Sequence, residues 1–143
     1  MITMHRTVST RTAPKAVFDY LADFTTTTEW EPGTVTTVLL DGDGGVGTRY
    51  ANTSRFAGRT SKLVYTVVAI TPGRLIALRG ENAAVTAYDT ITVCADGAGS
   101  QVQYKVEFAF HGALRWIEIL LRPAVASLLA KGARGLREKL EAL

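Results

Sequence analysis

The sequence predicts an α+β fold, in which a curved antiparallel sheet of about seven strands wraps around one long C-terminal helix, with two short helices near the N-terminus. Short runs rich in Val, Thr, Ile and Tyr alternate with glycine-containing turns between residues 34 and 110, without intervening helical segments. After residue 110, apolar residues recur at helical spacing instead. Strands joined by tight turns pair antiparallel, because parallel pairing needs a long crossover. We expect one domain spanning residues 1–143.

The N-terminal segment is expected to supply one strand and the two short helices. Residues 2–10 are rich in Thr and Val and predict the first strand. Thr12 offers an N-cap hydroxyl to a helix that begins near Pro14 and runs to about Ala22. The polar residues 23–29 predict at most one further helical turn.

The other strands are predicted at residues 35–40, 48–55, 60–70, 75–79, 85–93 and 101–110. Alternation of side chains assigns an inner face to several of them. In the last strand, the inner set is Val102, Tyr104, Val106 and Phe108. The same test places Leu63, Tyr65 and Val67 inside, groups Tyr50 with Asn52 and Ser54, and groups Asp89 with Ala87, Ile91 and Val93.

The C-terminal segment carries an apolar stripe at helical spacing, made of Leu114, Ile117, Leu121, Val125, Leu128, Leu136 and Leu140. Because proline disrupts a helix interior, we expect a short helical piece to end near Arg122 and a long helix to begin with Pro123 in its first turn.

This layout predicts an internal cavity. Only one long helix covers the sheet, and its small residues, Ala126, Ala130, Gly132, Ala133 and Gly135, leave the space beneath unfilled. Polar side chains on the inner face favour a pocket wall, because a packed core avoids polar groups without partners. The candidate ligand contacts are Trp30, Tyr50, Asn52, Ser54, Tyr65, Arg79, Tyr104, Val106, Phe108, Leu121 and Leu128, although the pattern leaves the parity of Arg79 open. Alternatively, the polar groups bond one another inside a solid core, and Trp30 plugs one end of the sheet.

Several classes of function are disfavoured. One cysteine, Cys94, excludes an internal disulfide, and His5 and His111 lie too far apart in the sequence to suggest a metal site. The glycine-rich segment 41–47 lacks the residues of a phosphate or calcium loop, so we expect no cofactor. A net charge of +3 without a binding motif disfavours nucleic acid.

The most apolar window, residues 116–130, is interrupted by charges and is too short for stable membrane insertion. The N-terminus does not resemble a signal peptide, and we expect a cytoplasmic protein. Nothing in the pattern identifies a protein partner.

Several segments of the chain resemble the START-like, pollen-allergen-like (SRPBCC) superfamily. They are Ala13–Phe24, Glu29–Trp30, Pro32–Gly33, Gly45–Tyr50 and Gly99–Tyr104, together with Gly112, Pro123 and Gly135–Leu136. Within it, the chain is most similar to the polyketide cyclase/dehydratase and lipid-transport family. The resemblance implies a helix-grip fold with a ligand cavity under the C-terminal helix. It implies no single chemistry, because such families include lipid carriers, hormone receptors and aromatic polyketide cyclases.

Three functions therefore remain as candidates: binding of a small molecule, catalysis on one, and protein interaction without a ligand. The favoured one is binding or transport of a hydrophobic small molecule, such as a polyketide, lipid or sterol-like compound. The alternative is a polyketide cyclase, aromatase or dehydratase, with Asp89 as an acid/base whose pKa burial would raise. In that case Tyr50, Tyr65, Tyr104 or Arg79 would polarise a carbonyl group of the substrate.

Overall fold

The computed structural model describes residues 1–56 and 58–143, apart from the side chains of Phe56, Ala113, Leu114 and Ile117. The predicted stripe positions Leu114 and Ile117 therefore lie outside the described side chains.

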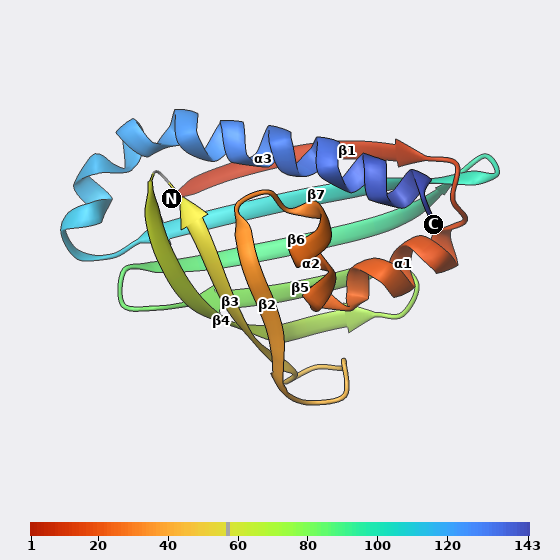
Figure 1. Ribbon diagram of the computed structural model, residues 1–143, viewed down its shortest axis with the longest axis horizontal. Coiled ribbons are helices and arrows are strands. Elements are labelled where there is room, and N and C mark those ends of the chain that lie inside the picture. Colours follow the sequence, from red (N-terminus) through yellow and green to blue (C-terminus); the bar gives the residue numbers. More distant parts are fainter. Residues whose placement is uncertain (57) are drawn as a thin grey trace.

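Seven strands and a long C-terminal helix make up most of the chain (Figure 1). The strands are β1 (Ile2–Thr10), β2 (Thr34–Asp41), β3 (Arg49–Phe56), β4 (Arg59–Thr71), β5 (Leu75–Glu81), β6 (Val85–Asp96) and β7 (Gly99–Phe110). The helices are α1 (Pro14–Ala22), α2 (Thr27–Trp30) and α3 (Glu118–Glu141), with 3-10 turns η1 (Phe24–Thr26) and η2 (Gly112–Ile117). The predicted α+β helix-grip fold is confirmed, and β1 has the predicted bounds.

The strands form one antiparallel sheet in the order β1-β7-β6-β5-β4-β3-β2. Consecutive strands from β2 to β7 are neighbours, and the last strand, β7, also pairs with the first strand, β1. The pairing of β4 with β5 shifts between Val67 and Ala69, and the pairing of β2 with β3 shifts between Thr34 and Thr36 and between Leu39 and Asp41. Such irregularities bend strands and increase their twist, which accounts for the strong curvature of the β2–β4 side (Figure 1).

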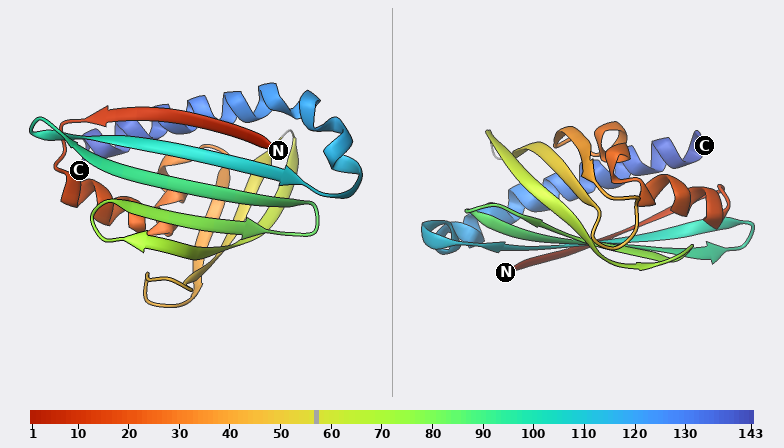
Figure 2. Two further views of the ribbon diagram at one scale, coloured as in Figure 1. Left: turned by 180° about the vertical axis from the view of Figure 1, so that it is seen from behind. Right: turned by 90° about the horizontal axis from the view of Figure 1, so that it is seen from below.

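All three helices lie on the concave side of the sheet, as the view from below in Figure 2 shows. The α3 helix packs most closely against β1 and α2, while α1 packs against β6 and β7. The long helix therefore runs over one edge of the sheet, and the short helices close one end. The inner side chains of β3, β4 and β6 face space beneath α3 rather than a second layer of helices.

The start of α1 differs from the prediction. Its N-cap is Ala13, without a side-chain hydrogen bond, and Thr12 does not cap the helix. Instead, the Thr12 hydroxyl donates a 2.6 Å hydrogen bond to the Leu140 carbonyl near the end of α3. The Ser100 hydroxyl in turn donates to the Thr12 carbonyl at 2.7 Å. Thr12 thus joins the first strand connection to the C-terminal helix, a contact that local sequence cannot reveal.

The break expected at Pro123 is also wrong. The α3 helix begins at Glu118 and continues through Pro123, and the short helical piece before it is η2, which ends at Ile117. Because Pro123 lies near the start of the helix, its missing N–H removes a single bond, to the carbonyl of Ile119. Residue 119 is exposed, so water can satisfy that carbonyl group.

Two glycines of α3 have a different role from the one expected. A Cβ atom on Gly135 would lie 2.2 Å from the Trp30 carbonyl oxygen, and one on Gly132 would lie 2.8 Å from Oε2 of Glu31. These positions therefore do not leave space under the sheet. They allow the loop after α2 to press against the helix, and this contact positions Glu31.

Candidate functional site

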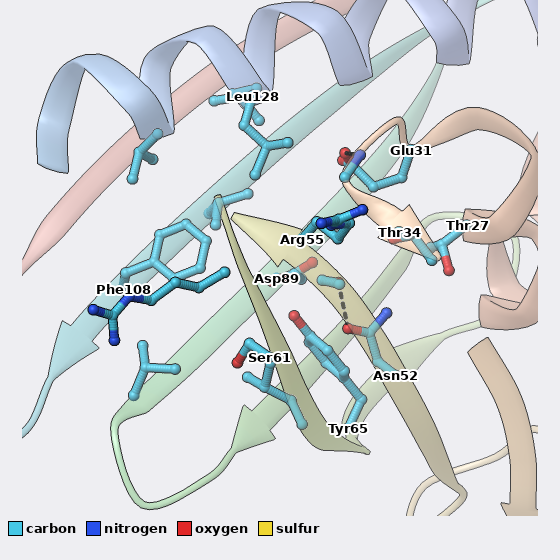
Figure 3. Close-up of a pocket in the computed structure, with 18 of the residues that line it drawn as sticks. Thr27, Glu31, Thr34, Asn52, Arg55, Ser61, Tyr65, Asp89, Phe108 and Leu128 are labelled. Carbon is cyan, nitrogen blue, oxygen red and sulfur yellow. Dashed lines mark hydrogen bonds between the residues drawn. The ribbon is translucent and has the colours of Figure 1, made fainter. Parts of the chain in front are cut away.

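A cavity of about 550 Å³ lies between the first half of α3 and the inner face of the sheet. Its wall is predominantly apolar and includes Leu63, Val85, Val106, Phe108, Val125 and Leu129. Figure 3 shows the labelled side chains converging on this space from α3, the sheet and the α2–β2 loop. Its size falls within the usual range for pockets that bind small molecules.

Asp89 provides a buried carboxyl group in the wall of this cavity. The residue is 4% exposed and lies on β6, where it pairs with Val106 of β7 and Leu78 of β5. Its Oδ2 accepts a 2.8 Å hydrogen bond from the Tyr104 hydroxyl. Its Oδ1 is buried and has no hydrogen-bond partner among the described residues. Burial raises the pKa of Asp89 to about 6, although the hydrogen bond from Tyr104 opposes this shift.

Glu31 supplies a second carboxyl group, which sequence reasoning missed. It follows α2 directly, and its Oε1 accepts a 2.9 Å hydrogen bond from the N–H of Gly33. Burial raises its pKa to about 7, the Gly33 hydrogen bond lowers it, and the charge of Asp89 raises it further. Glu31 lies in a loop without periodicity, so strand alternation gave no signal for it. The close approach to Gly132 is a packing signal that needs the structure.

Tyr65 and Tyr104 complete the polar group at this end of the cavity. Burial raises the pKa of both phenols, and the charges of Asp89 and Glu31 raise them further, so both remain protonated at neutral pH. The Tyr65 ring lies against Gly80 of the neighbouring strand, where a Cβ atom would lie 2.7 Å from the ring. Gly80 thus gives the ring room over β5. In Figure 3 the Tyr65 hydroxyl points toward Asp89.

Asn52 and Ser54 line the cavity, but their polar groups are already engaged. The Asn52 amide donates to the Thr37 hydroxyl at 2.9 Å, and the Ser54 hydroxyl donates to Asn52 Oδ1 at 2.6 Å. The Thr37 hydroxyl also lies 2.8 Å from that of Thr27. This chain of bonds ties β3 to β2 and α2. It matches the alternative in which these polar residues satisfy one another.

The cavity wall also includes two exposed arginines, Arg55 and Arg59, at adjoining ends of β3 and β4. Among the described residues, neither side chain takes part in an ion pair. Leu121 and Leu128 of α3 belong to the same wall and are only partly buried. Arg55 also adjoins the Glu31 loop, because its N–H donates to the Gly33 carbonyl at 2.7 Å. The exposed residues of the wall are therefore cationic and apolar, whereas Asp89, its most buried charged group, is acidic.

Of the predicted ligand contacts, Asn52, Ser54, Tyr65, Tyr104, Val106, Phe108, Leu121 and Leu128 line the cavity, as does Asp89. Three others do not. Trp30 is buried with its ring edge-to-face against Tyr104, and the centroids of the two rings are 5.7 Å apart. Tyr50 lies behind Phe24, whose ring contacts both Tyr50 and Tyr65.

Arg79 is on the outer face of β5, because Leu78 and Gly80 on either side of it are buried. Its guanidinium group pairs with Glu81 at 2.6 Å, so its inclusion among the ligand contacts is wrong. Residues 75–78, at the start of β5, are all apolar, so both faces of the strand look alike there. For this reason, alternation alone did not show which face Arg79 occupies.

The described residues contain no cluster of three or more His, Cys, Asp or Glu side chains suited to hold a metal ion. Among them, no helix has the length and apolar character that crossing a membrane requires.

The curved sheet, the long helix and the cavity between them define a helix-grip domain of the class that binds small molecules. The chain belongs to the family described as polyketide cyclase / dehydrase and lipid transport, whose pattern matches residues 1–141. This membership supports hydrophobic ligand binding or a polyketide cyclase or dehydrase role. No curated protein sequence matches the chain.

Solved structures share the fold over nearly the whole chain. The Zhui aromatase/cyclase from Streptomyces sp. R1128 has a TM-score of 0.84 at 16% identity, covering 98% of this chain and 93% of its own. A START superfamily protein from Mycobacterium smegmatis has a TM-score of 0.82 at 11% identity, with 98% and 97% covered. The structure of Ara h 8.0201 has a TM-score of 0.71 at 17% identity, with 99% of each chain covered. At these identities the similarity establishes the fold alone.

Proposed function

We propose that residues 1–143 act as one domain that binds or carries a hydrophobic small molecule, such as a polyketide, lipid or sterol-like compound, in the cavity under α3. The single observation that carries the proposal is the 550 Å³ cavity with its predominantly apolar wall. At about 24 cal/mol per Å³, an empty space of this size would cost roughly 13 kcal/mol, as much as the stability of a typical domain. Occupation by a ligand or by water removes most of that cost.

The side chains proposed to contact the ligand have distinct roles. The apolar wall, including Val106, Phe108, Leu121 and Leu128, would supply affinity by removing ligand surface from water. The polar groups of Asp89, Tyr65 and Tyr104 would orient the ligand.

Native mass spectrometry of gently purified protein tests the proposal directly, because a retained ligand appears as added mass. Val125→Phe should weaken binding of anilinonaphthalene sulfonate, a dye that fluoresces in apolar pockets, by about tenfold or more, since the larger side chain enters the cavity. Val125 is buried and lines the cavity. Ser127→Phe, exposed on the same helix, is the matched control and should bind the dye normally. Equal affinities in both variants, or no dye binding to the unmodified protein, would contradict the proposal.

A second candidate function, a polyketide cyclase, aromatase or dehydratase, is favoured by one specific observation. Asp89 combines a pKa of about 6 with an oxygen that none of the described residues hydrogen-bonds, in a cavity wall that also holds two protonated tyrosines. A carboxylate with this pKa can accept a proton from the carbon between two carbonyl groups of a polyketone. The resulting enolate carbon would attack another carbonyl and form the ring bond, while Tyr65 donates to the developing oxyanion. The protonated Asp89 would return its proton to that oxyanion and so give the ring hydroxyl group. In the dehydration, Asp89 would take the remaining hydrogen of the attacking carbon and pass that proton to the hydroxyl group, which leaves as water while the ring double bond forms.

The enzyme hypothesis predicts a large effect of Asp89→Asn on turnover of a linear polyketone. The rate should fall by about 10²–10⁴-fold, because the amide cannot accept the proton. In the unmodified protein, the rate should rise with pH through about 6, as Asp89 ionises. Binding of the dye should change little in the variant. Turnover within a few-fold of the original would remove Asp89 from the role of base and leave the carrier function.

A further inference from the structure

The buried end of the cavity holds a carboxyl oxygen that the described residues leave unsatisfied, and a phenol hydroxyl that points toward it. Oδ1 of Asp89 has no partner among the described residues, although Asp89 is 4% exposed. The Tyr65 hydroxyl, which points toward Asp89 in Figure 3, forms no side-chain hydrogen bond with that part of the chain. Leaving a buried acceptor unsatisfied is unfavourable, and native proteins rarely do so. The two groups together fit a molecule that both donates and accepts a hydrogen bond.

These polar groups are separated from the more exposed part of the cavity by an apolar section. Asp89 lies four residues along β6 from Val85, and Tyr65 lies four residues along β4 from Ser61. At about 3.3 Å per residue, each separation is roughly 13 Å. Leu63 of β4 and Phe108, which pairs with Ala87 of β6, contribute to the wall between. A ligand that reaches Asp89 therefore needs an elongated apolar body.

The charges along the cavity wall indicate which polar groups a ligand can carry at each end. Arg55 and Arg59 line the cavity near its exposed part, which favours an anionic group there and disfavours a cation. An ammonium group would also have to leave water to reach the acids, and the strong cost of burying it offsets its attraction to them. An ammonium group also has no lone pair to accept a hydrogen bond from the Tyr65 hydroxyl. A hydroxyl group donates to Asp89, accepts from Tyr65 and carries no charge to bury.

We propose that the cavity is selective for an elongated amphipathic acid that carries an uncharged hydroxyl at its buried end, placed between Asp89 Oδ1 and the Tyr65 hydroxyl, with its carboxylate near Arg55 and Arg59. The proposal rests on the proposed binding function and narrows it to a class of ligand. Hydroxylated fatty acids and phenolic acids share this chemistry.

Calorimetric titration with three matched acids tests the proposal on the unmodified protein. The ligands are dodecanoic acid, ω-hydroxydodecanoic acid and ω-aminododecanoic acid, which differ only in the terminal group. The hydroxy acid should bind at least about tenfold more tightly than dodecanoic acid, because its hydroxyl bonds to a charged acceptor. ω-Aminododecanoic acid should bind more weakly than ω-hydroxydodecanoic acid. Equal affinities for the hydroxy acid and dodecanoic acid, or tightest binding of the amino acid, would overturn the proposal.

Substitutions at each end of the cavity test which residues bind the hydroxyl group and which bind the carboxylate. Asp89→Leu should reverse the preference, so that dodecanoic acid binds more tightly than the hydroxy acid, while Tyr88→Leu, outward-facing on the same strand, should keep it. The double variant Arg55→Gln, Arg59→Gln should weaken both acids several-fold and leave their ratio unchanged. The double variant Arg74→Gln, Arg137→Gln, at exposed positions outside the cavity wall, is its charge-matched control. A preference that survives Asp89→Leu would overturn the assignment.

Failure of this inference is distinguishable from failure of the binding function. If the three acids do not bind but anilinonaphthalene sulfonate still binds in a manner sensitive to Val125→Phe, the amphipathic-acid proposal is overturned and the binding function stands. If the dye also fails to bind, both are overturned.

Discussion

Asp89→Asn is expected to stabilise the folded protein by about 2–3 kcal/mol at pH 8, even though it removes the carboxyl group proposed to orient the ligand. Burial raises the pKa of Asp89 from 3.8 to about 6, so the folded protein binds this proton more tightly than the unfolded chain does. The contribution of Asp89 to stability is therefore complete below pH 3.8 and is lost as the pH rises through 6. Asparagine keeps a hydrogen-bond acceptor for Tyr104 without the buried charge.

Urea denaturation at a series of pH values measures this difference. The gap between variant and unmodified protein should be largest above pH 7, and should shrink toward zero near pH 3, below both pKa values, where Asp89 is protonated in the folded and the unfolded state. At pH 8 the gap corresponds to a rise in Tm of about 10 °C. Glu138→Gln, exposed on α3, is the control and should change stability by less than about 0.5 kcal/mol at any pH. A variant less stable than the unmodified protein at pH 8 would contradict the raised pKa.

Glu31 should extend the same behaviour to higher pH. Its pKa rises from 4.5 to about 7, so its contribution to stability is lost between these values, partly because Asp89 has already become charged. A buried acid that destabilises its own fold at neutral pH is the pattern expected of a functional site, where stability is given up for a group that the ligand or reaction needs. For this reason the acids, rather than the satisfied Asn52 network, are the centre of the candidate site.

Strand alternation predicted the inner face correctly where the strands are regular. Tyr65, Asp89 and Tyr104 lie on the cavity wall because side chains on a strand alternate with a period of two, and this rule needs no tertiary information. It left Arg79 undecided because β5 is apolar on both parities at its start. The resolving signal is Gly80, whose missing side chain makes room for Tyr65, and that pairing depends on the register of β4 with β5.

Features that depend on contacts between distant segments could not be predicted from local pattern. Thr12 has the sequence context of an N-cap but bonds to Leu140, which is 128 residues away in the chain. Glu31 lies outside any periodic segment, and its raised pKa arises from burial in the folded protein. Tyr50 has the inward parity of its strand and still does not line the cavity, whereas Phe24, whose ring packs against both Tyr50 and Tyr65, does. Parity thus identifies the inner face without showing which part of that face is hollow.

Gly135→Ala is expected to destabilise the protein by about 1–3 kcal/mol, whereas Gly132→Ala should be neutral or slightly stabilising. Alanine favours a helix over glycine by about 1 kcal/mol at either position, so intrinsic propensity predicts the same gain twice. The difference lies in what each new methyl group meets. At position 135 it would lie 2.2 Å from the Trp30 carbonyl oxygen, which belongs to the backbone. At position 132 it would lie 2.8 Å from the end of the Glu31 side chain, which can rotate away.

Thermal and urea denaturation of the two variants, compared at pH 5, decide this prediction, and the pair serves as its own control because the substitution is identical. The Gly132→Ala variant has a further expected effect, since displacing the Glu31 carboxyl from its site next to Gly33 changes the acid end of the cavity. It should weaken the proposed selectivity for a hydroxylated acid without a loss of stability, while Gly135→Ala should lose stability first. Equal stability of the two variants would mean that the helix and the α2–β2 loop can separate at little cost. In that case the position of Glu31, and with it the acidic end of the cavity, would not be held by the close packing of these glycines.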